Sequence, residues 1–348
     1  MNKVKVGVLG ATGMVGQRFI QLLADHPWFE VTELAASEKS AGRTYREVME
    51  GRWKLPTPIP EGVGRLMVKE CVPELDCRIA FSALDADVAG PIEQAFAAAG
   101  YVVSSNSRNH RMEADVPLLI PEVNADHLEL IPTQKRNRGW KGMIVTNPNC
   151  TTIHLVLVLK PLMQFGLSQV FVTSMQALSG AGYPGVASLD IVDNVVPFIG
   201  GEEEKVERET VKLLGKCEER KVQFAPIVVS AHCNRVGVVD GHTECVSVKL
   251  SKKPGVAAIV NAFREFNPLQ GLGLPSAPAH PIVVRDEPNR PQPRMDRDLE
   301  KGMASVVGRV RECPLLDYKL VLMGHNTIRG AAGAAILNAE LMKSKGYI

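Results

Sequence analysis

The chain has 348 residues, a formal net charge of +2, 45% hydrophobic residues and 22% charged residues. That length suits two domains, and the composition is typical of a globular protein. The small net charge indicates no nucleic-acid partner, and no apolar run reaches the roughly 18 residues of a membrane span. The seven cysteines lack metal-ligand spacing and follow no export signal, which predicts reduced thiols, no bound metal and a cytoplasmic location.

The first half of the chain alternates apolar strands with helical patterns. Strands are predicted at residues 4–9, 31–37, 77–84 and 101–106, and helices at residues 15–27 and 90–100. The apolar run at 77–84 is typical of a parallel strand covered on both faces of its sheet. This alternation favours an α/β fold with a doubly wound, Rossmann-type domain that binds a dinucleotide.

The second half of the chain has a different pattern. Strands are predicted at residues 168–178 and 243–250, and an amphipathic helix at residues 206–215. Both strands alternate apolar and polar side chains, as strands do when one face of their sheet is open. We therefore expect an α+β catalytic and dimerisation domain with a mixed sheet at residues 150–326. The dinucleotide-binding domain then covers residues 1–149, and a small-residue helix at 327–348 returns to complete it.

A glycine-rich turn joins the first strand to the first helix. Its sequence, GATGMVG, is a GxxGxxG variant of the dinucleotide-binding fingerprint. Glycines let the backbone turn tightly and approach a pyrophosphate, which the free N–H groups at the start of the helix bind. The residues expected to contact the cofactor here are Gly10, Thr12, Gly13, Met14, Val15 and Gly16.

The end of the second strand indicates which dinucleotide is bound. An NAD site usually has an acidic residue there to bind the ribose 2′-hydroxyl, whereas this chain has Ser37-Glu38-Lys39-Ser40. Hydroxyl groups and a lysine suit a 2′-phosphate, so Ser37 and Ser40 are expected to contact NADP. Glu38 would favour NAD if it pointed into the site, and use of both nucleotides stays open.

A cysteine lies where a strand is expected to give way to a helix. The segment TNPNCTT, residues 146–152, has turn-forming Asn and Pro residues before Cys150, which is expected to begin the helix. A helix N-terminus lowers the pKa of a thiol from about 8.5 toward neutrality. The thiolate of Cys150 is then a nucleophile for a carbonyl carbon. Each of the other six cysteines fits a buried structural role.

Several segments resemble the aspartate-β-semialdehyde dehydrogenase family, and most closely its archaeal and fungal branch. They are GATGMVG (10–16), DVPLLIPEVN (115–124), TNPNCTT (146–152), SGAGYPG (179–185), RVGVVDGH (235–242), RPQPR (290–294) and NTIRGAAG (326–333). The resemblance covers essentially the whole chain and departs from the family's nucleophile motif only at Thr146, which replaces a serine. It implies reduction of L-aspartyl 4-phosphate to L-aspartate 4-semialdehyde with NADPH, through a thioester on Cys150, in lysine, threonine and methionine biosynthesis.

The resemblance also assigns roles to individual residues. Cys150, His242 and Gln176 match the family's catalytic residues; Arg111, Arg235, Lys205, Glu202 and Asn149 match its substrate-binding residues; and Ser82, Ser179, Gly180 and Asn326 match cofactor contacts. His242 is the expected acid/base that takes the thiol proton and later protonates the oxyanion. Apart from the resemblance, EEEKVERE reads as a solvated helix face, and Arg108 competes with Arg111 for the phosphate. A homodimer or homotetramer is expected.

Three other functions remain open from the sequence. A malonyl-CoA or succinyl-CoA reductase on the same scaffold would use the same thioester, but Asn147 and Asn149 beside Cys150 favour an acyl phosphate. An N-acetyl-glutamyl-phosphate reductase typically has NPGC and lacks the flanking motifs. A non-enzymatic NADP sensor would not need both Cys150 and His242.

Overall fold

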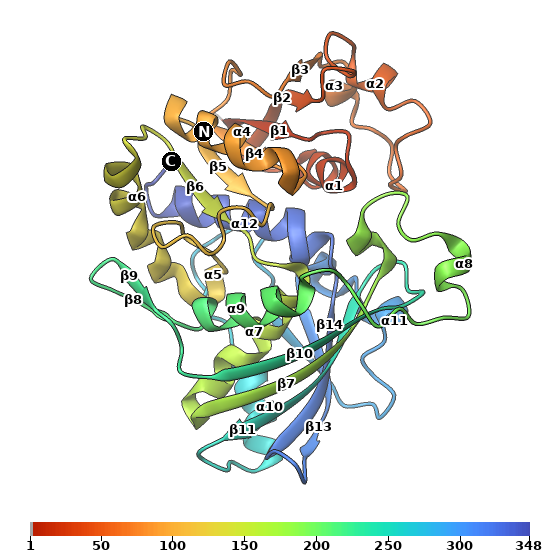
Figure 1. Ribbon diagram of the computed structural model, residues 1–348, viewed down its shortest axis with the longest axis vertical. Helices are drawn as coiled ribbons and strands as arrows, with labels where there is room; N and C mark the ends of the chain where they lie inside the picture. The colour runs from red at the N-terminus through yellow and green to blue at the C-terminus, as the bar shows by residue number, and fades with distance from the viewer. Residues whose placement is uncertain (1–2) are drawn as a thin grey trace.

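Six parallel strands form the sheet of the N-terminal half, in the order β3-β2-β1-β4-β5-β6 (Figure 1). The computed structural model describes residues 3–348. The strands are β1 (Val4–Leu9), β2 (Phe29–Ala36), β3 (Val68–Glu70), β4 (Ile79–Ser82), β5 (Val102–Ser105) and β6 (Met143–Thr146). The strand order reverses between β1 and β4, and ligands of such sheets bind beyond the carboxyl ends of the strands at that point.

Helices cover both faces of this sheet. Successive residues of each strand point to opposite sides, and apolar residues on both sides pack against helices. The helices of this half are α1 (Met14–Leu23), α2 (Tyr45–Val48), α3 (Glu61–Gly64), α4 (Ala86–Ala99), α5 (Pro121–Asn124) and α6 (Ile131–Arg138). Val8 and Phe81 pack on the side of α1, whereas Leu9 and Ala80 pack on the side of α4. Two buried faces explain the nearly continuous apolar runs of these strands.

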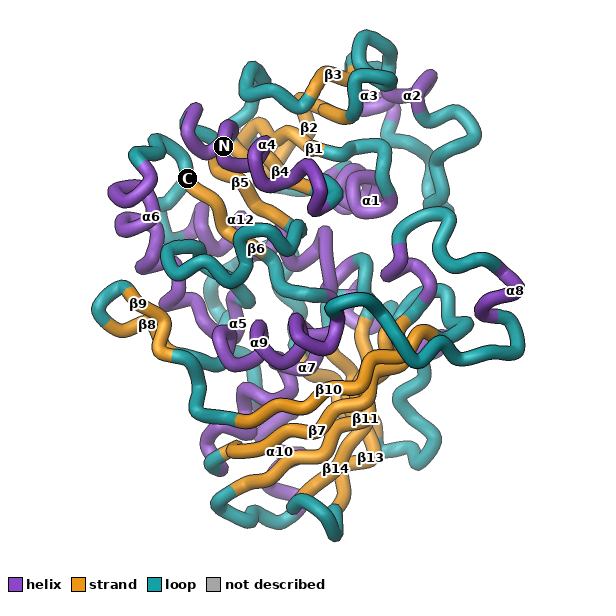
Figure 2. The backbone as a smooth tube through the Cα atoms, viewed as in Figure 1, coloured by secondary structure: helices purple, strands orange, loops and turns teal. Residues whose placement is uncertain are grey.

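The second half contains a mixed six-stranded sheet, in the order β10-β7-β11-β14-β13-β12 (Figure 2). Its strands are β7 (Leu167–Gln176), β10 (Val228–Arg235), β11 (His242–Leu250), β12 (Ile282–Arg285), β13 (Ser305–Glu312) and β14 (Tyr318–Gly324), and β8 (Lys216–Glu218) and β9 (Lys221–Gln223) form a separate hairpin. The helices are α7 (Cys150–Leu162), α8 (Ser188–Ile191), α9 (Glu202–Leu213), α10 (Val256–Glu265) and α11 (Pro293–Asp296). Helices α7, α9 and α10 share one core with the sheet.

The C-terminal segment packs against the N-terminal sheet. It was expected to be one long helix, but it begins as a π-helical turn at Ile328–Ala332 and continues as α12 (Gly333–Ser344). Residues of α12 belong to the same core as α1, and the Ser104 hydroxyl on β5 donates a hydrogen bond to the Ala335 carbonyl at 3.2 Å. Figure 1 shows α12 beside β5 and β6, close to the N-terminus.

The predicted fold class is confirmed: a Rossmann-type parallel sheet is followed by a domain with a mixed sheet. The expected strands lie within a few residues of the observed ones, and helix α4 ends, as expected, before Gly100. Helix α9 begins at Glu202, four residues before the predicted helix. Within residues 3–348, no helix has both the length and the apolar composition needed to cross a bilayer.

Glu244 is a buried carboxyl group on the face of β11 that packs against the helices. It lies opposite Ser174 on β7 and Leu322 on β14. Its side chain is fully buried, and neither carboxyl oxygen has a hydrogen-bond partner among the described residues. Burial without a counter-charge raises the pKa of Glu244 well above its usual value of 4.5. The carboxyl group is therefore protonated in the folded protein at pH values where the unfolded chain is ionised.

We expect Glu244→Gln to remove part of the pH dependence of stability. Because the folded pKa is raised, the folded state binds more protons, and stability falls as pH rises above the unfolded pKa. The variant should gain about 1.4 kcal/mol relative to wild type for each pH unit above about 4.5, until the folded group ionises. Urea unfolding at pH 5 to 8 measures this, with exposed Glu204→Gln as control. Parallel profiles for Glu244→Gln and wild type would contradict the protonated carboxyl.

Candidate active site

The nucleophile loop lies between β6 and α7, and Cys150 is the first residue of α7. The Asn149 side-chain oxygen caps this helix by accepting hydrogen bonds from the backbone N–H groups of Thr151 at 2.9 Å and Thr152 at 3.1 Å. Such a cap stabilises a helix by about 1 kcal/mol. The predicted position of Cys150 at a helix start is confirmed, and the Asn149 cap holds it there.

Strand β11 places His242 beside the thiol. The Cys150 Sγ atom lies 3.0 Å from His242 Nε2, and the Ala177 backbone N–H donates to His242 Nδ1 at 3.0 Å. Since a backbone N–H only donates, Nδ1 is the acceptor, and the neutral imidazole carries its proton on Nε2. This tautomer directs the Nε2 proton at the sulfur. An imidazolium ring would instead place an Nδ1 proton against the Ala177 N–H.

Both members of this pair are neutral in the ligand-free protein. Burial and, to a smaller extent, the Glu202 carboxylate raise the pKa of the Cys150 thiol to about 12, although Arg111 and Arg235 act in the opposite direction. Burial and the positive charge of Arg235 lower the pKa of His242 to about 3. The expectation that the helix N-terminus brings the thiol pKa toward neutrality is therefore wrong for this state. Desolvation outweighs the two arginines and the backbone hydrogen bond that favour the thiolate.

Four charged residues lie along one face of α9, and two of them, Glu202 and Lys205, line the active-site cavity. Glu202, Lys205, Glu209 and Lys212 are three or four positions apart, so they lie along one side of the helix. Glu202 accepts a hydrogen bond from the Asn149 side-chain amide at 2.7 Å and lies 3.0 Å from the Lys205 ammonium. Although burial opposes ionisation, Lys205 and Asn149 hold the pKa of Glu202 below its usual value. The interpretation of this segment as a solvated face is therefore wrong, because the face packs on the nucleophile loop.

Two arginines from different domains line the cavity that Cys150 also lines. Arg111 donates from Nη1 to Glu209 at 2.9 Å and from Nη2 to the Asn106 carbonyl at 2.7 Å. Arg235, at the end of β10, donates from Nη1 to the Ala177 carbonyl at 2.7 Å. Both side chains are almost fully buried, whereas the competing Arg108 also lines the pocket but is exposed. The protein thus presents two desolvated guanidinium groups close to the thiol.

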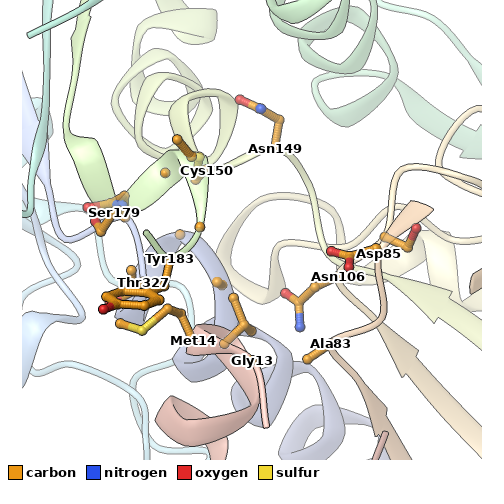
Figure 3. Close-up of a pocket in the computed structure, with 18 of the residues that line it drawn as sticks. Gly13, Met14, Ala83, Asp85, Asn106, Asn149, Cys150, Ser179, Tyr183 and Thr327 are labelled. Carbon is orange, nitrogen blue, oxygen red and sulfur yellow. Dashed lines mark hydrogen bonds between the residues drawn. The ribbon is translucent and has the colours of Figure 1, made fainter. Parts of the chain in front are cut away.

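The pocket has a volume of about 1090 Å³ and lies between the two domains. Figure 3 shows Cys150 and Ser179 on one side of it, with Gly13, Met14 and Ala83 opposite. Of the predicted site residues, those that line it are Cys150, Gln176, Arg111, Arg235, Lys205, Glu202, Asn149, Thr12, Gly13, Met14, Val15, Ser179, Gly180 and Asn326. Residues distant in the sequence are therefore brought together around one cavity.

The cavity wall at α1 suits the pyrophosphate of a dinucleotide. Among the described residues no side chain caps the N-terminus of α1, and its first turn contains no acidic residue. A Cβ atom at Gly16 would lie 2.3 Å from the Gly10 carbonyl oxygen, so the tight turn requires glycine there. Gly10 and Gly16 shape this turn without lining the cavity, whereas Thr12 to Val15 face it. The helix N-terminus is thus free to bind an anion.

Other predicted cofactor contacts lie outside the cavity wall. Ser37 is exposed, Ser40 is buried, and Ser82 is fully buried at the end of β4, and none of the three lines the cavity.

At the opposite end of the cavity, the Asn326 side-chain amide donates to the Ser179 hydroxyl at 2.7 Å, and the Asn326 side-chain oxygen accepts from the Gly241 N–H at 2.9 Å. These bonds fix the Asn326 side chain at the cavity edge.

Sequence reasoning missed several residues of this site. Glu209 and Lys212 are buried against the loop that carries Arg111. Arg52, Lys54 and Tyr183 line the cavity. The Lys54 ammonium lies 4.8 Å from the Tyr183 ring centroid, a cation–π contact between the two domains. Only the spacing of Glu209 and Lys212 from Glu202 carried a signal, since it places all three on one helical face.

Comparisons with known proteins agree with the resemblance in the motifs. Residues 5–131 match the family described as semialdehyde dehydrogenase, NAD binding domain, and residues 159–329 match semialdehyde dehydrogenase, dimerisation domain. The aspartate-semialdehyde dehydrogenase of Archaeoglobus fulgidus is 56% identical over 98% of this chain and 98% of its own length. That of Methanothermobacter thermautotrophicus is 57% identical over 97% of this chain and 99% of its own.

A solved structure agrees with the same relationship. The crystal structure of aspartate semialdehyde dehydrogenase with NADP from Candida albicans has a TM-score of 0.90 at 46% identity, covering 99% of this chain and 100% of that one. High identity over nearly the full length of each protein confirms the family suggested by the sequence motifs. The chain belongs to the aspartate-semialdehyde dehydrogenase family.

Proposed function

We propose that the protein reduces L-aspartyl 4-phosphate to L-aspartate 4-semialdehyde with NADPH, through a thioester on Cys150, in the biosynthesis of lysine, threonine and methionine. The observation that carries the proposal is a thiol 3.0 Å from His242 Nε2, in a cavity that Arg111 and Arg235 also line. The names of its full-length relatives support it and disfavour a CoA-thioester reductase. A thiol-based acyl transfer needs this combination of nucleophile, proton donor and anion-binding groups.

Cys150 and His242 carry the covalent chemistry in this proposal. The Cys150 sulfur bonds to the carbonyl carbon of the acyl phosphate, the bond from that carbon to the phosphate oxygen breaks, and the thiol proton leaves with the phosphate as hydrogen phosphate. NADPH, when bound, supplies the hydride that reduces the resulting thioester. His242 donates its Nε2 proton in a hydrogen bond first to the sulfur and then to the carbonyl oxygen on which negative charge develops. That oxygen re-forms the carbonyl group of the semialdehyde as the carbon–sulfur bond breaks, and the sulfur takes up a proton from solvent to restore the thiol. Gln176 lines the cavity beside them and helps to hold the intermediate.

Each charged group of the substrate is bound by a different set of charged side chains. Arg235 binds the α-carboxylate, because a guanidinium matches a carboxylate in two parallel hydrogen bonds. Arg111 and Lys205 bind the phosphate, and Glu202 binds the α-ammonium group. Asn149 keeps Glu202 in place through its amide. Burial lowers the pKa of Arg235 from its usual value, but a guanidinium still remains charged at neutral pH.

The cofactor fits the wall of the cavity formed by the N-terminal domain. Residues Thr12 to Val15 at the start of α1 line this wall and would hold the pyrophosphate, whereas Ser179, Gly180 and Asn326 line the cavity and would bind the nicotinamide. NADP in the Candida albicans relative supports the 2′-phosphorylated form. Contacts from Ser37, Ser40 and Ser82 remain predictions from the sequence. A lysine near this wall, Lys54, adds positive charge.

A second copy of the chain completes the proposed assembly. Within residues 3–348 no helix covers one face of the mixed sheet, and alternate residues on β7 and β10 are exposed there, including Phe171 and Val228. Such a face suits burial against an identical one, and the dimerisation-domain match supports it. A homodimer or homotetramer, the domain boundary at residues 149 and 150, and a cytoplasmic location remain predictions.

The substrate assignment is tested by two assays with the purified protein. Aspartate semialdehyde with phosphate should reduce NADP, whereas malonyl-CoA and succinyl-CoA should not support oxidation of NADPH. Phosphate is a small dianion that Arg111 and Lys205 suit, and a CoA thioester offers no α-ammonium group for the buried Glu202. We expect kcat/KM to be higher with NADP than with NAD. Reduction of CoA thioesters without any phosphate-dependent reaction would overturn the assignment.

Cys150→Ser should abolish turnover while leaving the fold intact, because serine fits the same space but is a far weaker nucleophile at neutral pH. Steady-state assays and thermal unfolding check both points. Peptide mass mapping should find an acyl or alkyl adduct on Cys150 only in the wild type. Cys313 is the internal control, since backbone N–H groups of Leu316 and Leu315 lower the pKa of its partly exposed thiol. Substantial turnover by the serine variant would exclude a covalent intermediate.

His242→Gln should retain more activity than His242→Ala. The glutamine amide presents an N–H donor near the position of Nε2, whereas alanine presents none, and one hydrogen bond to a charged group is worth about tenfold or more in rate. Comparing kcat for the two variants, each with a measured melting temperature, decides the role. Equal and complete loss in both would show that His242 must accept the thiol proton, as the sequence suggested.

A further inference from the structure

Glu209 links the loop that carries Arg111 to the nucleophile loop between β6 and α7. Its Oε1 atom accepts a hydrogen bond from Arg111 Nη1 at 2.9 Å, and its Oε2 atom accepts one from the Asn149 backbone N–H at 2.7 Å. We propose that Glu209 is a positioning residue, which sets the place of the Arg111 guanidinium relative to Cys150. The role of Arg111 as phosphate anchor belongs to the proposed function, and this inference rests on it.

The Glu209 carboxylate is bound on both oxygens and is almost completely buried. Its residue is only 2% exposed, and that of Arg111 is 8% exposed, so water competes little for either charge. A buried charge that loses its partner is strongly destabilised, so the pair has few alternative arrangements. One carboxylate therefore fixes two groups at once: the guanidinium that faces the cavity and the backbone N–H just before the nucleophile.

Lys212 attaches the same loop to α9 one turn further on. Its ammonium donates to the carbonyl oxygens of Arg111 at 2.7 Å, Glu113 at 2.8 Å and Val116 at 3.0 Å. Burial lowers the pKa of Lys212 to about 8. The backbone of the Arg111 loop and the Arg111 side chain are thus both bound to α9, through side chains three residues apart.

Helix α9 also holds the other side of the nucleophile loop. Glu202, two turns before Glu209, binds the Asn149 side-chain amide at 2.7 Å. Asn149 is therefore bound to α9 at its backbone and at its side chain, while its side-chain oxygen caps α7. Since α9 is one continuous helix, the distance between the anion site and the Cys150 sulfur is set by a single rigid element. The phosphate must lie on the carbon that the sulfur attacks, so this distance matters for the reaction.

The test compares Glu209→Gln with Glu207→Gln. Glu207 is the matched control, because its carboxylate also accepts a backbone N–H, that of Ala231 at 3.1 Å, but from the edge of β10. In Glu209→Gln the amide oxygen can accept from only one of the two donors, and its NH₂ group opposes the other. We expect the KM for phosphate to rise by about tenfold or more, and kcat to fall, since a misplacement of about 1 Å is costly.

Three further readouts separate positioning from general destabilisation. The alkylation rate of Cys150, followed by peptide mass mapping, should change in Glu209→Gln and not in Glu207→Gln. Melting temperatures report the structural effect of each variant. In a double-mutant cycle with Arg111→Ala, the effects on the KM for phosphate should not add, because Glu209 acts on phosphate through Arg111. If Glu209→Gln does not fold, Glu209→Asp, which keeps the charge but shortens its reach, is measured in the same way.

The outcomes distinguish this inference from the proposed function. A wild type without phosphate-dependent activity would remove the proposed function itself. An active wild type, with a folded Glu209 variant that matches Glu207→Gln in the KM for phosphate and in Cys150 alkylation, would overturn the positioning role. Additive effects in the cycle would also overturn it, since they would mean that Glu209 acts independently of Arg111.

Discussion

The bonds around Asn149 determine how the active site is assembled. Its side-chain oxygen caps α7, its amide binds Glu202, and its backbone N–H binds Glu209. Because Cys150 is the next residue, each of these bonds limits where the sulfur can lie. A single residue between β6 and α7 thus connects the helix that begins with the nucleophile to the helix that carries the charged groups.

The C-terminal segment brings the two domains together at the same place. A Cβ atom at Gly330, in the π-helical turn, would lie 2.9 Å from the Cys150 Cβ atom, so glycine allows this close approach. The neighbouring Arg329 forms a fully buried pair with Glu122, with hydrogen bonds of 2.9 and 2.6 Å. Removing either partner would leave a charge buried without compensation. The pair therefore keeps the π-helical turn against the nucleophile in one arrangement.

Burial determines the electrostatic state of the site as much as charge does. Desolvation raises the pKa of Cys150 and lowers that of His242, so the resting pair is a neutral thiol beside a neutral imidazole. Arg111 and Arg235 favour the thiolate, whereas Glu202 opposes it. A substrate that pairs with Glu202 through an ammonium group would reduce that opposition. The same low-dielectric environment strengthens the hydrogen bond from His242 Nε2 to developing negative charge.

The sequence alone was sufficient for features that depend on local pattern. The apolar runs predicted the parallel sheet, the glycine spacing predicted the turn at Gly10 to Gly16, and the Asn-Pro-Asn segment predicted Cys150 at a helix start, because each depends on neighbouring residues. Contacts between distant segments needed the tertiary structure. The sequence pattern of α9 indicates a solvated charged face, because the pattern does not contain its partners. Arg111 and Asn149, which bind Glu209, lie 98 and 60 positions away from it along the chain. The thiol pKa was likewise decided by burial, since desolvation depends on how the whole chain packs around Cys150.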